Sequence, residues 1–219
     1  WEGNCRTRVD VTGKIVSPGF IDIHTHSDTC PFSAVFPESK VAQGITLEIV
    51  GNCGVSAVPI LPSCQAEQTA YLRKISEIPV PEEAVRDASV QKYAAHAAQT
   101  GYPSHLGTLI GQGTLRAGIV GFQDRPLTPS EMEQMKFLLD DQLNQGALGL
   151  SLGLIYPPGS FSPTSELREL ARVVQKHKKI LAVHMRNEGP NIFQAVEEML
   201  SIAEETGVHL HISHLKLMG

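Results

Sequence analysis

Two histidines separated by a single residue, His24 and His26, carry the strongest chemical signal in the sequence. They end an apolar run that we expect to form a strand over Gly19–His26, and alternate side chains of a strand point to the same face. Ile21 and Ile23 would then lie on the opposite face. Two imidazoles that share a face at a strand end form half of a metal site, because zinc prefers nitrogen and sulfur ligands.

Three other segments supply candidates for the rest of the site. Cys53 lies in a Gly-Asn-Cys-Gly turn, and His184 and His214 each lie on a predicted strand. Because these side chains fall at or just after strand ends, we expect them to converge with His24 and His26 on a zinc site. The remaining cysteines and histidines are interpreted as ordinary buried or surface residues: Cys5, Cys30, Cys64, His96, His105, His177, His209 and His211.

The composition is ordinary for a globular protein and excludes several function classes. Of 219 residues, 42% are hydrophobic and 19% charged, and the net charge of -5 argues against a nucleic-acid-binding surface. The four cysteines form no Cys-x-x-Cys pair. Apolar runs are far shorter than the roughly 20 residues that a membrane span requires. We therefore expect a cytoplasmic protein without nucleic-acid or membrane partners.

Apolar strand-like runs alternate with amphipathic helical segments, as in repeated βαβ units with a parallel sheet. Thr128 and Glu131 are typical of a helix N-terminus, and Gly146 and Gly207 of helix ends. The segment 65–100 is predicted to be helical, with breaks at its prolines. The predicted strands are Gly19–His26, Ile45–Val50, His105–Ile110, Ala147–Leu154, Ile180–Arg186 and Val208–Lys216.

Three of the predicted helices show an apolar stripe that we expect to face the core. The first follows Thr128, the second opens at Ser162-Pro163, and the third opens at Gly189-Pro190. The expected stripes are Met132, Met135, Leu139 and Leu143 in the first helix, Leu167, Leu170, Ala171 and Val174 in the second, and Phe193, Val196, Leu200 and Ala203 in the third.

The placement of the polar residues decides between two α/β architectures. A (β/α)8 barrel collects its site from the carboxyl ends of several strands, as here, whereas a doubly wound sheet uses one switch point and a glycine fingerprint. The run 111–116 lacks the third glycine of that fingerprint. We therefore predict a partial (β/α)8 TIM-type barrel over 18–219, with about six of eight strands. Residues 1–17 are interpreted as the remnant of a flanking β-domain that is largely missing, so the chain is expected to be a fragment.

Five longer segments of the sequence match the motifs of a known family in order and spacing: PGFIDIHTHSD (18–28), GITLEIVGNCGVS (44–56), GLSLGLIYPPG (149–159), HMRNEG (184–189) and ISHLK (212–216). They resemble the N-acyl-D-amino-acid deacylase (D-aminoacylase) branch of the amidohydrolase superfamily. The resemblance implies zinc held tightly by Cys53, His184 and His214, with His24 and His26 facing a second, weaker position.

The same resemblance implies hydrolysis of N-acyl-D-amino acids to a carboxylate and a free D-amino acid. Lys216 matches a lysine that binds the substrate carboxylate, and Tyr156 is a candidate substrate contact in its loop. The general base of the family is an aspartate expected beyond Gly219, so we expect this chain alone to be poorly active. Gln112 stands where relatives often carry histidine.

Two alternatives stay open. One is a cyclic-amide hydrolase related to dihydroorotases or hydantoinases, although Ala147–Leu154 lacks the lysine or acidic residue that would bridge two metals, and Cys53 is the only anionic candidate ligand. The other is a non-catalytic, metal-binding partial barrel. An open barrel exposes sheet edges, so self-association is expected for a partial barrel.

Overall fold

The structure, a computed structural model, describes residues 3–32, 36, 38–73, 75 and 88–218. Within them the fold is α/β, with seven strands in two parallel sheets. The first sheet has the order β1 (Phe20–Asp22), β2 (Ile45–Val50), β3 (His105–Thr108). The second has the order β4 (Ile110–Gly111), β5 (Gly149–Gly153), β6 (Ile180–His184), β7 (His209–Ile212). The predicted parallel α/β architecture is confirmed.

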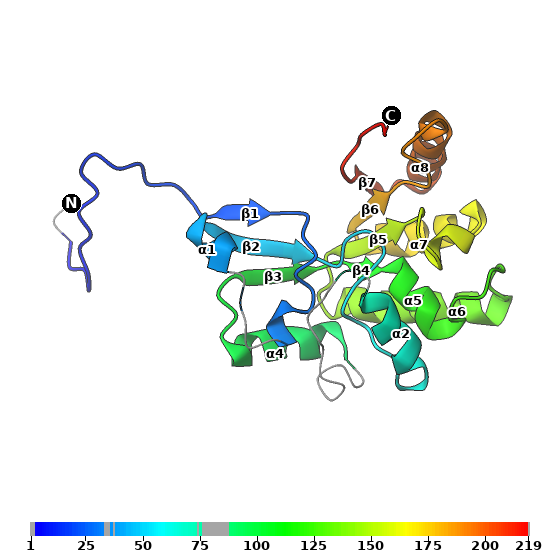
Figure 1. Cartoon of the computed structure of the whole chain (residues 1–219), viewed down its shortest axis with the longest axis horizontal. Coiled ribbons are helices and arrows are strands. Elements are labelled where there is room, and N and C mark those ends of the chain that lie inside the picture. The colour runs from blue at the N-terminus through cyan, green and yellow to red at the C-terminus, as the bar shows by residue number, and fades with distance from the viewer. Residues whose placement is uncertain (1–2, 33–35, 37, 74, 76–87, 219) are drawn as a thin grey trace.

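Helices connect successive strands, except β3 and β4, and pack against the sheets (Figure 1). In the described part of the chain, no helix is both long and apolar enough to cross a bilayer. The helices are α1 (Glu38–Ala42), α2 (Gln65–Leu72), α4 (Val90–Thr100), α5 (Gln112–Ile119), α6 (Pro129–Asn144), α7 (Thr164–Lys176) and α8 (Ile192–Thr206). Short 3-10 turns occur at Cys30–Phe32, Pro62–Cys64 and Gly159–Phe161.

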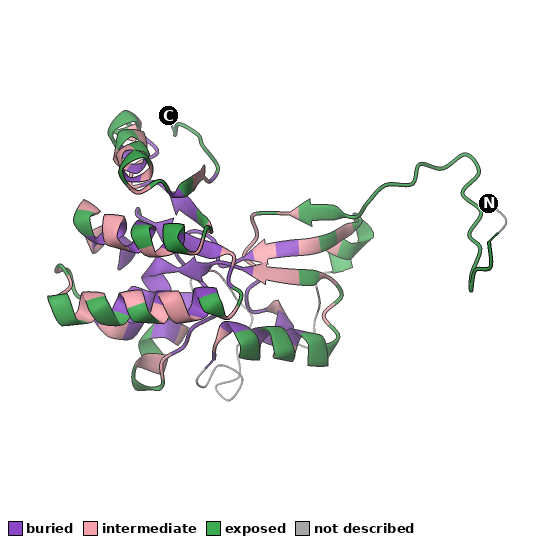
Figure 2. Cartoon of the chain, turned by 180° about the vertical axis from the view of Figure 1, so that it is seen from behind, coloured by how far each residue is buried: buried purple, intermediate pink, exposed green. Residues whose placement is uncertain are grey.

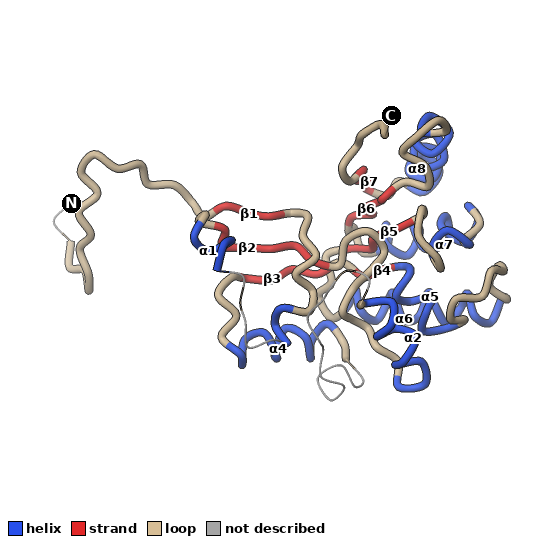
Figure 3. The backbone as a smooth tube through the Cα atoms, viewed as in Figure 1, coloured by secondary structure: helices blue, strands red, loops and turns tan. Residues whose placement is uncertain are grey.

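The strand predicted over His105–Ile110 is divided between the two sheets. Leu109 lies between β3 and β4, and its N–H donates to the carbonyl of Val50 at 2.9 Å. Here Gly51 lies directly against the chain, because a Cβ at that glycine would be 2.1 Å from the Leu109 carbonyl oxygen. The chain therefore passes from one sheet to the other at Leu109 (Figure 3), and the described residues form seven strands instead of six.

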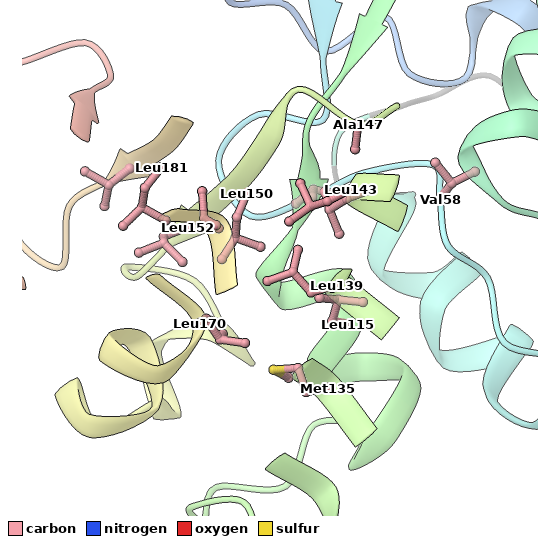
Figure 4. Close-up of a cluster of buried hydrophobic side chains, with 14 of the residues drawn as sticks. Val58, Leu115, Met135, Leu139, Leu143, Ala147, Leu150, Leu152, Leu170 and Leu181 are labelled. Atoms are coloured by element: carbon pink, nitrogen blue, oxygen red, sulfur yellow. The ribbon is translucent and has the colours of Figure 1, made fainter. Parts of the chain in front are cut away.

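The hydrophobic core lies between the four-stranded sheet and its helices (Figure 4). Leu150 and Leu152 of β5 and Leu181 of β6 are fully buried, and they belong to one cluster with Met135 and Leu139 of α6. Each such side chain contributes roughly 1.5–3 kcal/mol through burial. This half of the molecule is therefore held together mainly by apolar packing.

The predicted stripes of α6 and α7 are largely confirmed. The stripe of α8 is confirmed for Val196 and Ala203, which pack against the core, and wrong for Phe193 and Leu200. Thr128 and Glu131 form the expected capping box, and Met132 is only partly buried. On α8, Phe193 is 83% exposed and Leu200 42% exposed. The apolar residues of α8 cover roughly half of its circumference. Only one flank of that apolar face packs against the core, and periodicity alone does not select the flank. The residues that face the core are Ala195, Met199 and Ile202.

Residues 3–19 contain no helix or strand and run away from both sheets (Figure 1). Their assignment to a separate β-domain stays a prediction. The helix predicted over 65–100 is represented by α2 and α4. Its predicted break at Pro79 and Pro81 lies outside the described residues.

Candidate metal centre

His24 and His26 follow β1 and do not lie on it. The strand ends at Asp22, and Oδ1 of that residue accepts a hydrogen bond from the His24 N–H at 3.2 Å. The prediction that a strand carries both imidazoles is therefore wrong. The rings are nevertheless neighbours, with centroids 5.6 Å apart and planes nearly perpendicular.

Cys53 lies in the tight turn that follows β2 and is buried. Its backbone has a φ of 53°, a left-handed conformation that is uncommon for residues other than glycine. The thiol Sγ lies 3.4 Å from His24 Nε2 and 3.5 Å from His214 Nε2. The turn thus directs the sulfur towards one imidazole from each sheet.

His184 ends β6, as predicted, and is 6% exposed. His214 lies beyond β7, which ends at Ile212, so the strand predicted to continue to Lys216 is wrong. A φ of 34° at His214 turns the chain there. The ring centroids of His184 and His214 are 4.4 Å apart, and those of His24 and His214 are 5.1 Å apart. His214 is therefore the central imidazole of the cluster.

Glu188 is a member of the cluster that the sequence analysis missed. It is 3% exposed, and its Oε1 lies 3.0 Å from His214 Nδ1 and 3.6 Å from His184 Nε2. Its Oε2 accepts a hydrogen bond from the ammonium of Lys216. An acid four residues after His184, inside the HMRNEG segment, was a signal that could have identified it.

The structure brings four of the five predicted ligands into one cluster. Among the described residues, two sets of ligand atoms lie within 4.8 Å of one another, and His214 belongs to both. His26 adjoins His24 but belongs to neither set, and no set unites all three residues of the predicted tight site. The two sets are His24, Cys53 and His214, and His184, Glu188 and His214.

The donor chemistry of this cluster fits zinc. A tetrahedral ion with Zn–S of about 2.3 Å and Zn–N of about 2.05 Å places those ligands about 3.5 Å apart, close to the Cys53–imidazole distances given above. Within the described residues, both ring nitrogens of His184 and Nδ1 of His26 are buried without a hydrogen-bond partner. Buried polar atoms that lack a partner are costly, and coordination would satisfy the imidazole nitrogens.

Burial keeps the imidazoles in the form that binds metal. Desolvation, followed by repulsion from His26 and His214, lowers the pKa of His24 to about 4. Desolvation also lowers the pKa of His184 to about 4, and His214 and Lys216 act in the same direction. Both rings are therefore neutral at neutral pH, as metal ligation requires.

The Cys53 thiol responds to burial in the opposite sense. Desolvation, with smaller contributions from Glu188 and Asp28, raises its pKa to about 12. The thiol therefore keeps its proton at neutral pH unless a cation stabilises the thiolate. Burial also raises the pKa of the Glu188 carboxyl, but the Lys216 hydrogen bond and the neighbouring imidazoles outweigh it, so the net pKa is lowered.

The two candidate substrate contacts lie beside the same cluster. The Tyr156 ring is 4.8 Å from the His184 ring and is 43% exposed. Lys216 reaches the cluster through its ion pair with Glu188 and not through a shared strand with His214, as had been expected. Gln112 is buried elsewhere, where its Nε2 donates to Ser162 at 2.7 Å.

Comparison with known proteins places this chain in a family. The sequence matches the amidohydrolase family over residues 7–218. D-aminoacylase of Alcaligenes xylosoxydans xylosoxydans is 36% identical over 213 residues, which make up 97% of this chain and 43% of that protein. The predicted resemblance of this chain to the deacylase branch is thereby confirmed.

Two solved structures are similar over most of the chain. A D-aminoacylase with a binuclear metal centre has a TM-score of 0.79 at 35% identity, covering 98% of this chain and 44% of that one. N-acyl-D-glutamate deacylase from Bordetella bronchiseptica, complexed with zinc and a phosphonate inhibitor, has a TM-score of 0.76 at 35% identity, covering 92% and 41%. This chain thus spans less than half the length of these relatives, and within that span it belongs to the amidohydrolase family.

Proposed function

We propose that the protein is a zinc-dependent hydrolase that cleaves the amide bond of N-acyl-D-amino acids. The observation that carries this proposal is the convergence of Cys53, His24, His184 and His214 with Glu188. The substrate class is supported by the relatives, which are D-aminoacylase and the N-acyl-D-aspartate and N-acyl-D-glutamate deacylases. These relatives favour the deacylase over the cyclic-amide and non-catalytic alternatives.

We also propose that the two parallel sheets are parts of one (β/α)8 barrel. The candidate ligands follow the carboxyl ends of β1, β2, β6 and β7, which is where barrel enzymes place their sites. The TM-score of 0.79 with a D-aminoacylase supports the same architecture.

In this proposal Cys53, His184 and His214 hold the tightly bound zinc, and His24 and His26 face a second, weaker position. The chemistry that zinc supplies when bound is polarisation of the amide carbonyl and activation of water near neutral pH. Glu188 orients His214 through the 3.0 Å contact with Nδ1, as outer carboxylates do for metal-binding histidines. β5 contains no lysine or acidic residue that could bridge two metals. The thiolate of Cys53 would supply negative charge to the centre in its place.

Lys216 and Tyr156 are proposed to position the substrate. The Lys216 ammonium has three N–H donors, and one of them donates to Glu188. The other two are available for the α-carboxylate of an N-acyl amino acid. The exposed Tyr156 ring forms a wall beside His184. No residue of this chain is assigned as the proton acceptor. The resemblance implies that this role belongs to an aspartate after Gly219.

Substrate comparison tests this function. The zinc-loaded protein, expressed from its full reading frame, should release D-methionine from N-acetyl-D-methionine about 10²-fold faster than it acts on the L enantiomer. Lys216→Met should raise KM for the N-acyl amino acid more than for the corresponding N-acyl amine, which has no carboxylate. Faster turnover of dihydroorotate or a hydantoin than of any N-acyl-D-amino acid would overturn the substrate class.

A further inference from the structure

The turn that carries Cys53 is bridged by one hydroxyl group from another strand. Ser151, in the middle of β5, is fully buried. Its Oγ donates to the carbonyl of Gly51 at 2.5 Å and accepts from the N–H of Gly54 at 3.0 Å. A single side chain therefore connects the first and last residues of the Gly-Asn-Cys-Gly turn.

The backbone of β5 also lies directly against this turn. A Cβ at Gly153 would be 2.0 Å from the carbonyl oxygen of Cys53, and a Cβ at Gly54 would be 2.6 Å from the nitrogen of Gly153. Neither position has room for a side chain. The two glycines thus allow the close approach that brings Ser151 within hydrogen-bond distance of the turn.

The turn needs such support because of its backbone conformation. Cys53 has a left-handed φ of 53°, which a cysteine adopts only when its surroundings impose it. Asp28 Oδ1 accepts from the Gly51 N–H at 2.8 Å, and the Asn52 side chain donates to the Ile49 carbonyl at 2.9 Å. Those two contacts hold the start of the turn, whereas Ser151 also holds the N–H at its end.

We propose that Ser151 is a positioning residue that fixes Cys53 in the orientation required for metal binding. The inference rests on the proposed function, because it requires Cys53 to be a ligand. It also gives a role to a strand without acidic residues: β5 contributes to the centre through a hydroxyl that holds the backbone of a ligand from another sheet.

Zinc affinity of matched serine variants tests the inference. Ser151→Ala should weaken zinc binding about 10–100-fold, as measured by chelator competition, because outer contacts of metal ligands have effects of this size. The matched control is Ser162→Ala, which removes another buried hydroxyl that bonds to Glu166 and Gln112. The control should keep zinc affinity within about threefold of the unsubstituted protein. With cobalt in place of zinc, the thiolate-to-cobalt absorption should change in Ser151→Ala and not in Ser162→Ala.

Each outcome has a defined meaning. If Cys53→Ala releases the metal while Ser151→Ala and Ser162→Ala bind it equally well, the inference is overturned and the proposed ligand set stands. If Cys53→Ala keeps its zinc, the ligand set fails, and the role of Ser151 fails with it. If Ser151→Ala does not fold, hydrogen exchange of the Gly54 amide in the unsubstituted protein decides: slow exchange supports the bridge, and exchange at the rate of an exposed amide overturns it.

Discussion

The two sheets contribute ligands to the same cluster from very different surroundings. In the four-stranded sheet, β5 is buried throughout, and Leu152 is fully covered by helices. In the three-stranded sheet, β1 is largely exposed (Figure 2): Ile21 is 59% exposed and Phe20 is 61% exposed. His184 ends a strand of the four-stranded sheet and His214 follows another, whereas His24 and Cys53 follow strands of the three-stranded sheet. A common ligand cluster therefore does not require equal packing of the strands that precede it.

On the three-stranded side, a hydrogen-bond network beside β1 accompanies the apolar packing of Val50 and Tyr93. The ammonium of Lys40 donates to Asp22 at 3.1 Å, to Ser27 at 2.9 Å and to the buried Glu48 at 2.7 Å. It also bonds to Thr25, which lies between the two histidines. This network ties the segment after β1 to β2. The comparison indicates that one side of the cluster is positioned by a core and the other by a polar network.

The largest expected difference between the two sheets concerns stability. Leu152→Ala should lower the free energy of unfolding by about 2–5 kcal/mol, because it leaves a cavity in the core. Ile21→Ala should lower it by about 0.5 kcal/mol or less, because that side chain is largely exposed. Urea unfolding of both variants measures the difference.

The result of this pair also bears on self-association. If Ile21→Ala proved as destabilising as Leu152→Ala, the face of β1 would be covered in solution. Self-association through the open sheet would then be the expected cause, and the stability of the unsubstituted protein would depend on its concentration. Stability independent of concentration would contradict that explanation.

A smaller effect concerns protons released on metal binding. At pH 8 the His24 and His184 imidazoles, with pKa values of about 4, are already neutral, whereas the Cys53 thiol, with a pKa of about 12, is protonated. Binding zinc as a thiolate should therefore release one proton, and affinity should rise about tenfold per pH unit. Calorimetry in buffers of different ionisation enthalpy measures this release. Zinc binding without proton release would contradict a thiolate ligand.

The smallest of these effects distinguishes electrostatics from packing. The pKa of His24 and His184 is about 4 in the folded protein and 6.5 ordinarily, so the unfolded chain binds more protons between these values. The metal-free protein should therefore lose stability as the pH falls from about 6.5 to about 4. His24→Gln and His184→Gln should each reduce this loss, by about 1 kcal/mol or less for the half-buried His24, which solvent screens. Unchanged acid sensitivity in thermal melts would show that neither ring is desolvated.

Much of the architecture could be predicted from the sequence, and local turns could not. Alternating apolar runs were sufficient for the parallel α/β fold and for the buried stripe of α7. The buried flank of α8 was not, because its apolar face extends from the exposed Phe193 at one edge to the buried Ile202 at the other, and only tertiary packing selects between them. The division at Leu109 depends on a close backbone contact with Gly51, which periodicity does not report.

The candidate site shows the same limit. Residue types and strand ends were sufficient to predict that Cys53, His184 and His214 would come together. Glu188 was missed because it lies in a loop after β6, where no repeating pattern relates its side chain to the preceding histidine. His24 was placed on a strand because the apolar alternation continues past Asp22, where β1 ends.

The zinc content of cysteine variants, purified without added metal, tests the central claim most directly. Cys53→Ala should lose most of its zinc, because it removes the thiolate candidate and leaves Glu188 as the anionic group of the two ligand sets. Cys64→Ala, the matched control, should keep its zinc, since that partly exposed residue belongs to neither ligand set. Retention of zinc by Cys53→Ala, together with its release by His24→Ala and His26→Ala, would contradict the account.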